Sequence, residues 1–88
     1  MPQQWSYPAE LTEALLRFGL APRRETPPRF VRDQLSDLYR YEIRALRSRL
    51  LGGEVLKKDY IDHVIVLRKK YWPLSLTPDQ WDVICTSQ

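Results

Sequence analysis

The longest proline-free part of the chain, Arg29–Trp72, reads RFVRDQLSDLYRYEIRALRSRLLGGEVLKKDYIDHVIVLRKKYW. Helices can run through it without interruption because proline is absent. On both sides of the Gly52-Gly53 pair, apolar residues recur every three or four positions, which is the spacing of one helix face. We therefore predict helices over residues 29–51 and 57–72. Because their connection is short, we expect them to pack as a long antiparallel helical hairpin.

A shorter helix is expected before the hairpin, over residues 8–19. Its apolar side chains share one helical face: Leu11, Ala14, Leu15 and Phe18. Gly19 and Pro22 follow and are typical of a helix end. Residues 21–28 are rich in proline and polar residues, so we predict a linker there. Such a linker permits the first helix to be exchanged between two copies of the chain.

A last short helix is expected over residues 78–85. The sequence Thr77-Pro78-Asp79-Gln80 has a threonine cap, proline at the first helical position and glutamine at the third, which is typical of a capping box. With 88 residues, the chain is expected to form a single helical domain, residues 1–88. The predicted fold class is all-α, a small bundle of about four helices built on the hairpin.

The composition fits a globular protein and excludes several other classes. Apolar residues make up 43% of the chain and charged residues 28%, which argues against disorder, collagen and disulfide scaffolds. The single cysteine, Cys85, cannot form a disulfide within the chain. No stretch reaches the ~18 apolar residues of a membrane span, and the first residues lack the pattern of a signal peptide. We expect a cytoplasmic protein outside the membrane.

Catalytic and metal-binding motifs are not evident. The only histidine, His63, follows Asp59 by one helical turn, but two ligands fall short of the three or four that zinc or iron sites take from protein. There is no glycine-rich phosphate loop, and neither Cys85 nor any serine lies in a nucleophile motif. We therefore expect no enzyme activity, no catalytic residue, no metal ligand and no cofactor.

One acidic residue falls within the apolar stripe of the 29–51 helix. Glu42 lies between apolar positions, where a carboxylate must find a partner, reach solvent or shift its pKa upward. In an antiparallel hairpin Arg68 is a plausible partner, and Arg49, His63 or a tyrosine hydroxyl are alternatives. We therefore predict Glu42, His63 and Arg68 as buried polar residues.

The 29–51 helix also carries a row of arginines. Arg40, Arg44 and Arg47 lie on one side of it, and such a row is able to follow nucleic-acid phosphates. A charged outer face is equally what a solvated surface helix shows, or what an acidic protein partner needs. The overall net charge of +3 is only mildly basic, so nucleic-acid binding is the less favoured alternative.

Three tryptophans and five tyrosines are many for this length, and those near helix ends either close the ends of the bundle or form a binding patch. We predict a non-catalytic protein–protein interaction module, a small accessory or regulatory subunit of a larger cytoplasmic protein. The expected contact residues are aromatic at the centre and arginine at the rim: Tyr60, Tyr71, Trp72, Arg40, Arg44 and Arg47. A homodimer is compatible with the same surface, and the alternative function is a nucleic-acid-binding helical domain.

Overall fold

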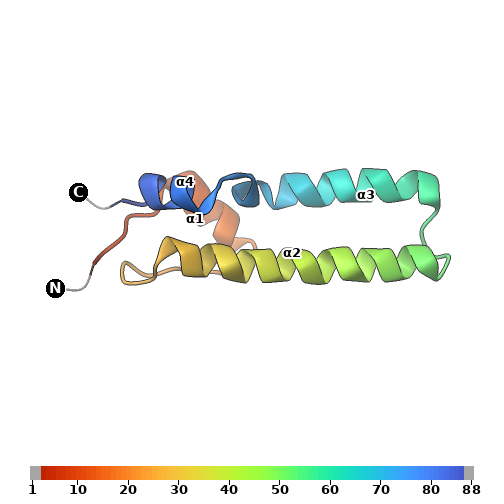
Figure 1. Ribbon diagram of the computed structural model, residues 1–88, viewed down its shortest axis with the longest axis horizontal. Coiled ribbons are helices and arrows are strands. Elements are labelled where there is room, and N and C mark those ends of the chain that lie inside the picture. Colours follow the sequence, from red (N-terminus) through yellow and green to blue (C-terminus); the bar gives the residue numbers. More distant parts are fainter. Residues whose placement is uncertain (1–2, 87–88) are drawn as a thin grey trace.

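The computed structural model describes residues 3–86, which form helices connected by short segments (Figure 1). The elements are α1 (Ala9–Leu16), α2 (Pro28–Leu51), α3 (Lys57–Lys70), a 3-10 turn η1 (Trp72–Ser75) and α4 (Pro78–Ile84). Within residues 3–86 the only strand-like feature is an isolated antiparallel bridge between Trp5 and Thr86. The all-α class predicted from the sequence is confirmed.

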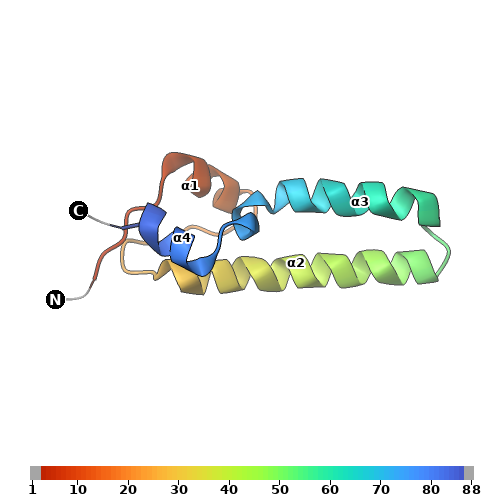
Figure 2. The same ribbon diagram turned by 45° about the horizontal axis from the view of Figure 1, so that its top comes forward.

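The elements follow one long axis. In Figures 1 and 2, α2 and α3 lie side by side and run in opposite directions, with residues 52–56 connecting them at one end. At the other end α1 and α4 pack near the beginning of α2. The principal extents are 54 × 20 × 16 Å. We call residues 40–70 the hairpin arm and the other described residues the core end.

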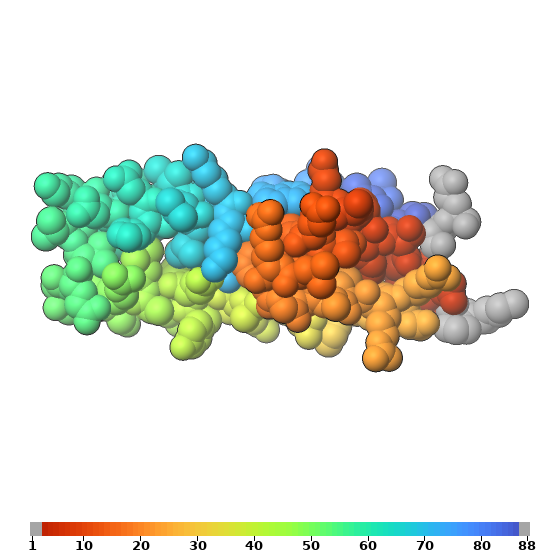
Figure 3. All heavy atoms as spheres, turned by 180° about the vertical axis from the view of Figure 1, so that it is seen from behind, coloured from red at the N-terminus to blue at the C-terminus, as the bar shows by residue number. Residues whose placement is uncertain are grey.

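The apolar core lies at the core end. It brings together residues from α1, α2, α4 and the segment after α3: Leu11, Leu15, Val31, Leu35, Tyr71, Trp81 and Cys85. Trp81 is fully buried, and its indole N–H donates a hydrogen bond to the Pro73 carbonyl at 2.8 Å. In Figure 3 the atoms of α1 lie over this end and leave most of the arm uncovered.

The first helix is shorter than the predicted 8–19 because residues 17–19 form a closing turn that ends at Gly19. Gly19 has a positive φ of 76°, which L-residues with a side chain rarely adopt. The Gly19 N–H donates to the Leu16 carbonyl, and the Leu20 N–H donates to the Leu15 carbonyl. This is the Schellman arrangement, which satisfies the last carbonyls of the helix. α1 therefore ends at Leu16.

A second Schellman end closes α2 at the tip of the arm. Gly53 has a φ of 79°, the Gly53 N–H donates to the Leu50 carbonyl, and the Glu54 N–H donates to the Arg49 carbonyl. The chain then turns back, and Val55 is buried beneath the turn. These bonds fix where α2 ends.

The predicted helix over 57–72 ends at Lys70, two residues early. Trp72 precedes Pro73, and a residue before proline is disfavoured in the α conformation. The chain bends at Tyr71 and continues as η1, which carries Pro73 into the core. After this bend Tyr71 is buried in the core, whereas Trp72 is exposed.

The fourth helix begins with the predicted capping box, which is confirmed. The Thr77 hydroxyl accepts from the Gln80 N–H at 3.2 Å, and the Gln80 side-chain carbonyl accepts from the Thr77 N–H at 2.8 Å. The beginning of α2 holds α4 through Arg29, which lies 2.5 Å from Asp79 and 2.8 Å from Asp82. These carboxylates raise the pKa of the Arg29 guanidinium, the Asp82 hydrogen bond contributing most.

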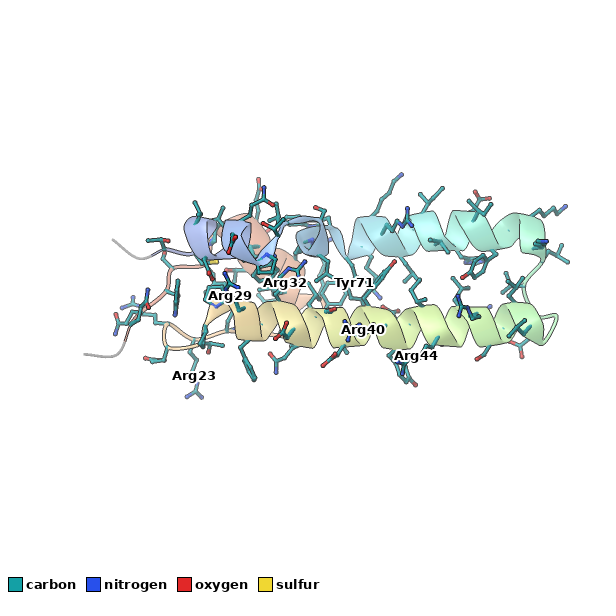
Figure 4. All side chains as sticks on the ribbon, in the orientation of Figure 1. Arg23, Arg29, Arg32, Arg40, Arg44 and Tyr71 are labelled. Atoms are coloured by element: carbon teal, nitrogen blue, oxygen red, sulfur yellow. The ribbon has the colours of Figure 1, made fainter. Side chains whose placement is uncertain are left out.

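One turn further along α2, Arg32 ties the helix to η1. Its guanidinium donates to the carbonyls of Leu76 at 3.0 Å and Leu74 at 3.3 Å. Figure 4 shows Arg29 and Arg32 pointing from α2 towards η1 and α4. The arginines at the core end of α2 are therefore used to hold the fold.

Candidate partner-binding surface

The hairpin arm exposes much of its apolar surface. α3 buries none of its residues, although six of its fourteen are apolar or aromatic. Within the arm only Leu46 and Val55 are buried apolar residues. The large apolar side chains that remain exposed there are Tyr41, Leu51, Leu56, Ile61, Ile65 and Val66. They lie on more than one side of the arm, since Tyr41 and Val66 line a hollow that does not include Ile61 or Ile65. Large exposed apolar patches are typical of interaction sites.

The arm is also where the positive charge of the protein is concentrated. Nine lysines and arginines lie in residues 40–70 against four aspartates and glutamates, a net charge of +5. The rest of the chain has five basic and seven acidic residues, a net charge of −2. The overall net charge of +3 is therefore the sum of a strongly basic arm and a slightly acidic core end.

The three predicted arginines of α2 border one shallow hollow. Arg40, Arg44 and Arg47 line it together with Tyr39 and Ile43, and its volume is about 240 Å³. Figure 4 shows Arg44 pointing away from α3. Within residues 3–86 the only ion pair of these three arginines is a 3.8 Å contact between Arg40 and Asp37 on the same helix. Both partners are well exposed to solvent, so this pair is weak.

A second hollow also lies next to Tyr39. It has a volume of about 300 Å³, shares Tyr39 with its neighbour, and adds Arg68 from α3. Ile61 and Ile65 lie on the same side of α3 as Arg68, because positions i, i+4 and i+7 of a helix share a face. We call the combined surface the arginine face: Tyr39, Arg40, Ile43, Arg44 and Arg47 of α2 with Ile61, Ile65 and Arg68 of α3.

The predicted aromatic patch of Tyr60, Tyr71 and Trp72 does not form one surface. Tyr71 is only 3% exposed and packs in the core against Phe18 and Tyr39, with ring centroids 4.4 and 5.3 Å away. Its interpretation as a contact residue is wrong, because the bend before Pro73 directs its ring inward. Tyr60 is half-buried, and Trp72 is exposed beside α1.

The carboxylate of Glu42 is partnered at the junction between the arm and the core end. It accepts a hydrogen bond from the Tyr71 hydroxyl and lies 3.2 Å from the Lys70 ammonium. A tyrosine hydroxyl was among the predicted partners, whereas the pairing with Lys70 was missed. Burial is the main cause that raises the pKa of Tyr71 well above its usual range, and Glu42 adds to the effect.

The prediction that Glu42, His63 and Arg68 are buried is wrong. Glu42 is half-buried, and His63 and Arg68 are exposed. The arm consists of α2 and α3 alone. No further helix covers the side chains that flank the contact between these two helices. Glu42 and His63 line one hollow of about 330 Å³ on the side of the arm opposite the arginine face, whereas Arg68 lies on the arginine face.

The surroundings of the cysteine and of the possible metal ligands do not favour chemistry. Cys85 is fully buried, and burial together with the charge of Asp82 raises its thiol pKa to about 11, which disfavours the nucleophilic thiolate. Within residues 3–86 no three histidine, cysteine, aspartate or glutamate side chains gather as a metal site would require.

None of the helices in this part of the chain combines the length and apolar character needed to cross a membrane.

Comparison of the chain with protein-family models, with curated proteins and with solved structures gives no match. The chemistry of the arm and of the core end is therefore the basis for assigning a function.

Proposed function

We propose that the protein is a non-catalytic protein–protein interaction module, a small accessory or regulatory subunit of a larger cytoplasmic protein or complex. In this proposal its one helical domain is built on the long hairpin, the core end maintains the fold, and the arm binds the partner. The observation that carries the proposal is that α3 buries none of its residues while Ile61, Ile65 and Val66 are exposed to solvent.

Elementary energetics favours this use of the arm. Single exposed apolar residues are normal on a protein surface, but Ile61 and Ile65 lie one helical turn apart and extend one face. Covering a half-exposed isoleucine contributes about 1 kcal/mol, so a partner gains affinity from each. Tyrosine and arginine, which line the two hollows described above, are frequent among the residues that dominate binding energies.

A nucleic-acid-binding domain is the second candidate, and the net charge of +5 on the arm favours it. Phosphate contacts depend steeply on salt, and a protein that neutralises six or more phosphates loses a factor of roughly 10³ or more in affinity between 50 and 200 mM salt. Apolar side chains between the arginines gain little from a phosphate backbone. We therefore place this candidate second.

Affinity capture with the full chain tests the proposal. The tagged protein is used to capture partners from the cells in which it occurs, with and without nuclease, and bound protein and nucleic acid are both measured. We expect one stoichiometric protein partner that survives nuclease. Nucleic acid alone, or proteins that are lost after nuclease treatment, would contradict the proposal and support the second candidate.

A pair of matched variants localises the binding. Ile61→Asp changes a residue of the arm that is 64% exposed, and Val83→Asp changes a residue of α4 that is 72% exposed. Both introduce one carboxylate at an exposed apolar position, so neither should unfold the protein. We expect Ile61→Asp to lose the captured protein and Val83→Asp to retain it. The reverse pattern would place the partner on the core end.

A further inference from the structure

We propose that the arginine face binds an acidic amphipathic helix of the partner protein. The inference rests on the proposed function and specifies the chemistry of the partner. Apolar residues of the partner helix would pack on Tyr39, Ile43 and the two isoleucines of α3, while its carboxylates would face the arginines on either side. The hairpin and the bound segment would then form a three-helix arrangement.

The spacing of the arginines suits a helical partner. Arg40, Arg44 and Arg47 are seven residues apart from first to last, which is about 10 Å or two turns of helix. Arg68 faces the same surface from α3, beside the hollow that contains Tyr39. α3 has 14 residues, so it offers a length of about 21 Å, enough for roughly four turns of a partner helix.

The arginines of this face lack counter-charges in the described chain. Within residues 3–86, Arg44, Arg47 and Arg68 have no carboxylate oxygen within 4.0 Å, and Arg40 has only the exposed 3.8 Å contact with Asp37. At the core end of the same helix, Arg29 contacts two carboxylates. Arginine binds carboxylates through paired hydrogen bonds, so the arginine face is suited to partner aspartates and glutamates.

Charge argues against a second copy of the chain as the occupant. Two arms brought together would each carry a net charge of +5, and like charges across an interface disfavour association. Nucleic acid satisfies the arginines but leaves the exposed isoleucines of α3 uncovered. An acidic helix with one apolar side satisfies both the charge and the apolar surface.

Binding of designed peptides to the full-length protein tests the inference. The probe is an 18-residue, dye-labelled peptide with leucine at helical positions i, i+3, i+4 and i+7 and glutamate at most others. A matched peptide has glutamine in place of every glutamate, and a labelled duplex oligonucleotide is the third probe. Fluorescence anisotropy at physiological salt gives the Kd for each. We expect the glutamate peptide to bind at least tenfold more tightly than either of the other probes.

Two charge-matched double variants locate the binding on the protein. The first is Arg44→Glu with Arg47→Glu, on the arginine face. The second is Arg23→Glu with Arg24→Glu, which alters exposed residues of the linker at the core end by the same total charge. We expect the first to weaken the glutamate peptide at least tenfold and the second to change it less than threefold. Circular dichroism confirms that both variants are folded.

Several results would overturn the inference. Equal binding of the glutamine peptide would show that the arginines do not select the partner, and tighter binding of the oligonucleotide would favour phosphate. A stable dimer by sedimentation that occludes the arm would favour a second copy. If every probe fails while affinity capture still recovers a partner lost in Ile61→Asp, the inference is wrong and the proposed function stands. If that capture also fails, both are wrong.

Discussion

The two halves of α2 have the same helical geometry and different surroundings. At the core end Arg29 and Arg32 contact carboxylates and backbone carbonyls of α4 and η1, and the neighbouring Val31 and Leu35 are buried. In the arm Arg44 and Arg47 have no such contacts within residues 3–86, and apolar neighbours such as Tyr41 are exposed. The helix therefore stabilises the fold with one half, and the other half is the one that we propose binds the partner.

The largest expected contrast comes from truncating an aromatic residue in each half. Trp81→Ala removes a fully buried side chain and its hydrogen bond to Pro73, and we expect it to cost about 3–5 kcal/mol of unfolding free energy. Tyr41→Ala removes a ring that is 74% exposed, and we expect a change within about 0.5 kcal/mol. Urea denaturation measures both. Similar costs for the two would contradict the division into core end and arm.

Alkaline pH should destabilise the core end. Burial raises the pKa of Cys85 from 9.0 to about 11 and also raises those of Tyr71 and Tyr7. A group whose pKa is higher in the folded protein favours folding when protonated, and this contribution is lost as the pH rises. We expect the urea midpoint to fall as the pH increases from about 9 to 11. Cys85→Ala should make the fall smaller, and an unchanged profile would show that the thiol does not contribute.

Two glycines with nearly the same backbone geometry provide a finer comparison. Gly19 closes α1 at the core end with φ 76°, and Gly53 closes α2 at the tip of the arm with φ 79°. A Cβ at either position has no atom within 4 Å, so replacement by alanine adds only backbone strain. We expect Gly19→Ala to cost about 1–2 kcal/mol of unfolding free energy. Gly53→Ala should cost less, because the tip of the arm can open locally without unfolding the core.

Thermal denaturation of the two alanine variants, measured side by side, checks this order. A larger loss for Gly53→Ala would mean that the arm and the core end unfold as one unit, and the comparison between them would need to be revised.

The junction between the halves should make a smaller contribution. Tyr71→Phe removes the hydroxyl that donates to Glu42, and Glu42→Gln removes the negative charge that also pairs with Lys70. The Glu42 side chain is one-third exposed, so we expect each variant to cost only about 1 kcal/mol. A double-mutant cycle from urea denaturation should show coupling between the two positions. Strictly additive effects would indicate that the hydrogen bond adds no stability in solution.

The smallest expected effect on stability is at the proposed binding surface. Ile61→Asp replaces an exposed residue of α3, and we expect its unfolding free energy to stay within about 0.5 kcal/mol of the parent protein. Urea denaturation checks this value. A loss of several kcal/mol would mean that Ile61 is part of the core, and a loss of binding in that variant could then not be assigned to the arm.

The sequence predicts the helical class well because local signals are strong. Proline positions, the apolar spacing and the Thr77–Gln80 capping box all act within a few residues. The early end of α1 and the 3-10 turn after α3 depend on hydrogen bonds of Gly19 and on the placement of Pro73 in the core. The turn after α3 requires the tertiary structure, whereas the end of α1 is set by local hydrogen bonds of Gly19 and Leu20. The predicted helices extend too far at both places.

The candidate site could be predicted only in part for the same reason. The arginine row of α2 follows from helical spacing alone, whereas the addition of Arg68 depends on how α3 packs beside α2. Tyr71 shares the α3 stripe with Tyr60, yet only the bend after Lys70 determines that its ring joins Phe18 and Tyr39 in the core. Likewise, the sequence pattern predicts that Glu42 is buried, but it does not specify that the arm is only two helices thick.

Hydrogen exchange of the free protein and of its captured complex tests the division between the two halves most directly. In the free protein we predict slow exchange for the amides of α2 near Val31 and Leu35 and faster exchange for those of α3, which buries no residue. In the complex, exchange should slow in residues 40–70 and change little at the core end. Slowing confined to the core end, with the arm unchanged, would contradict the account.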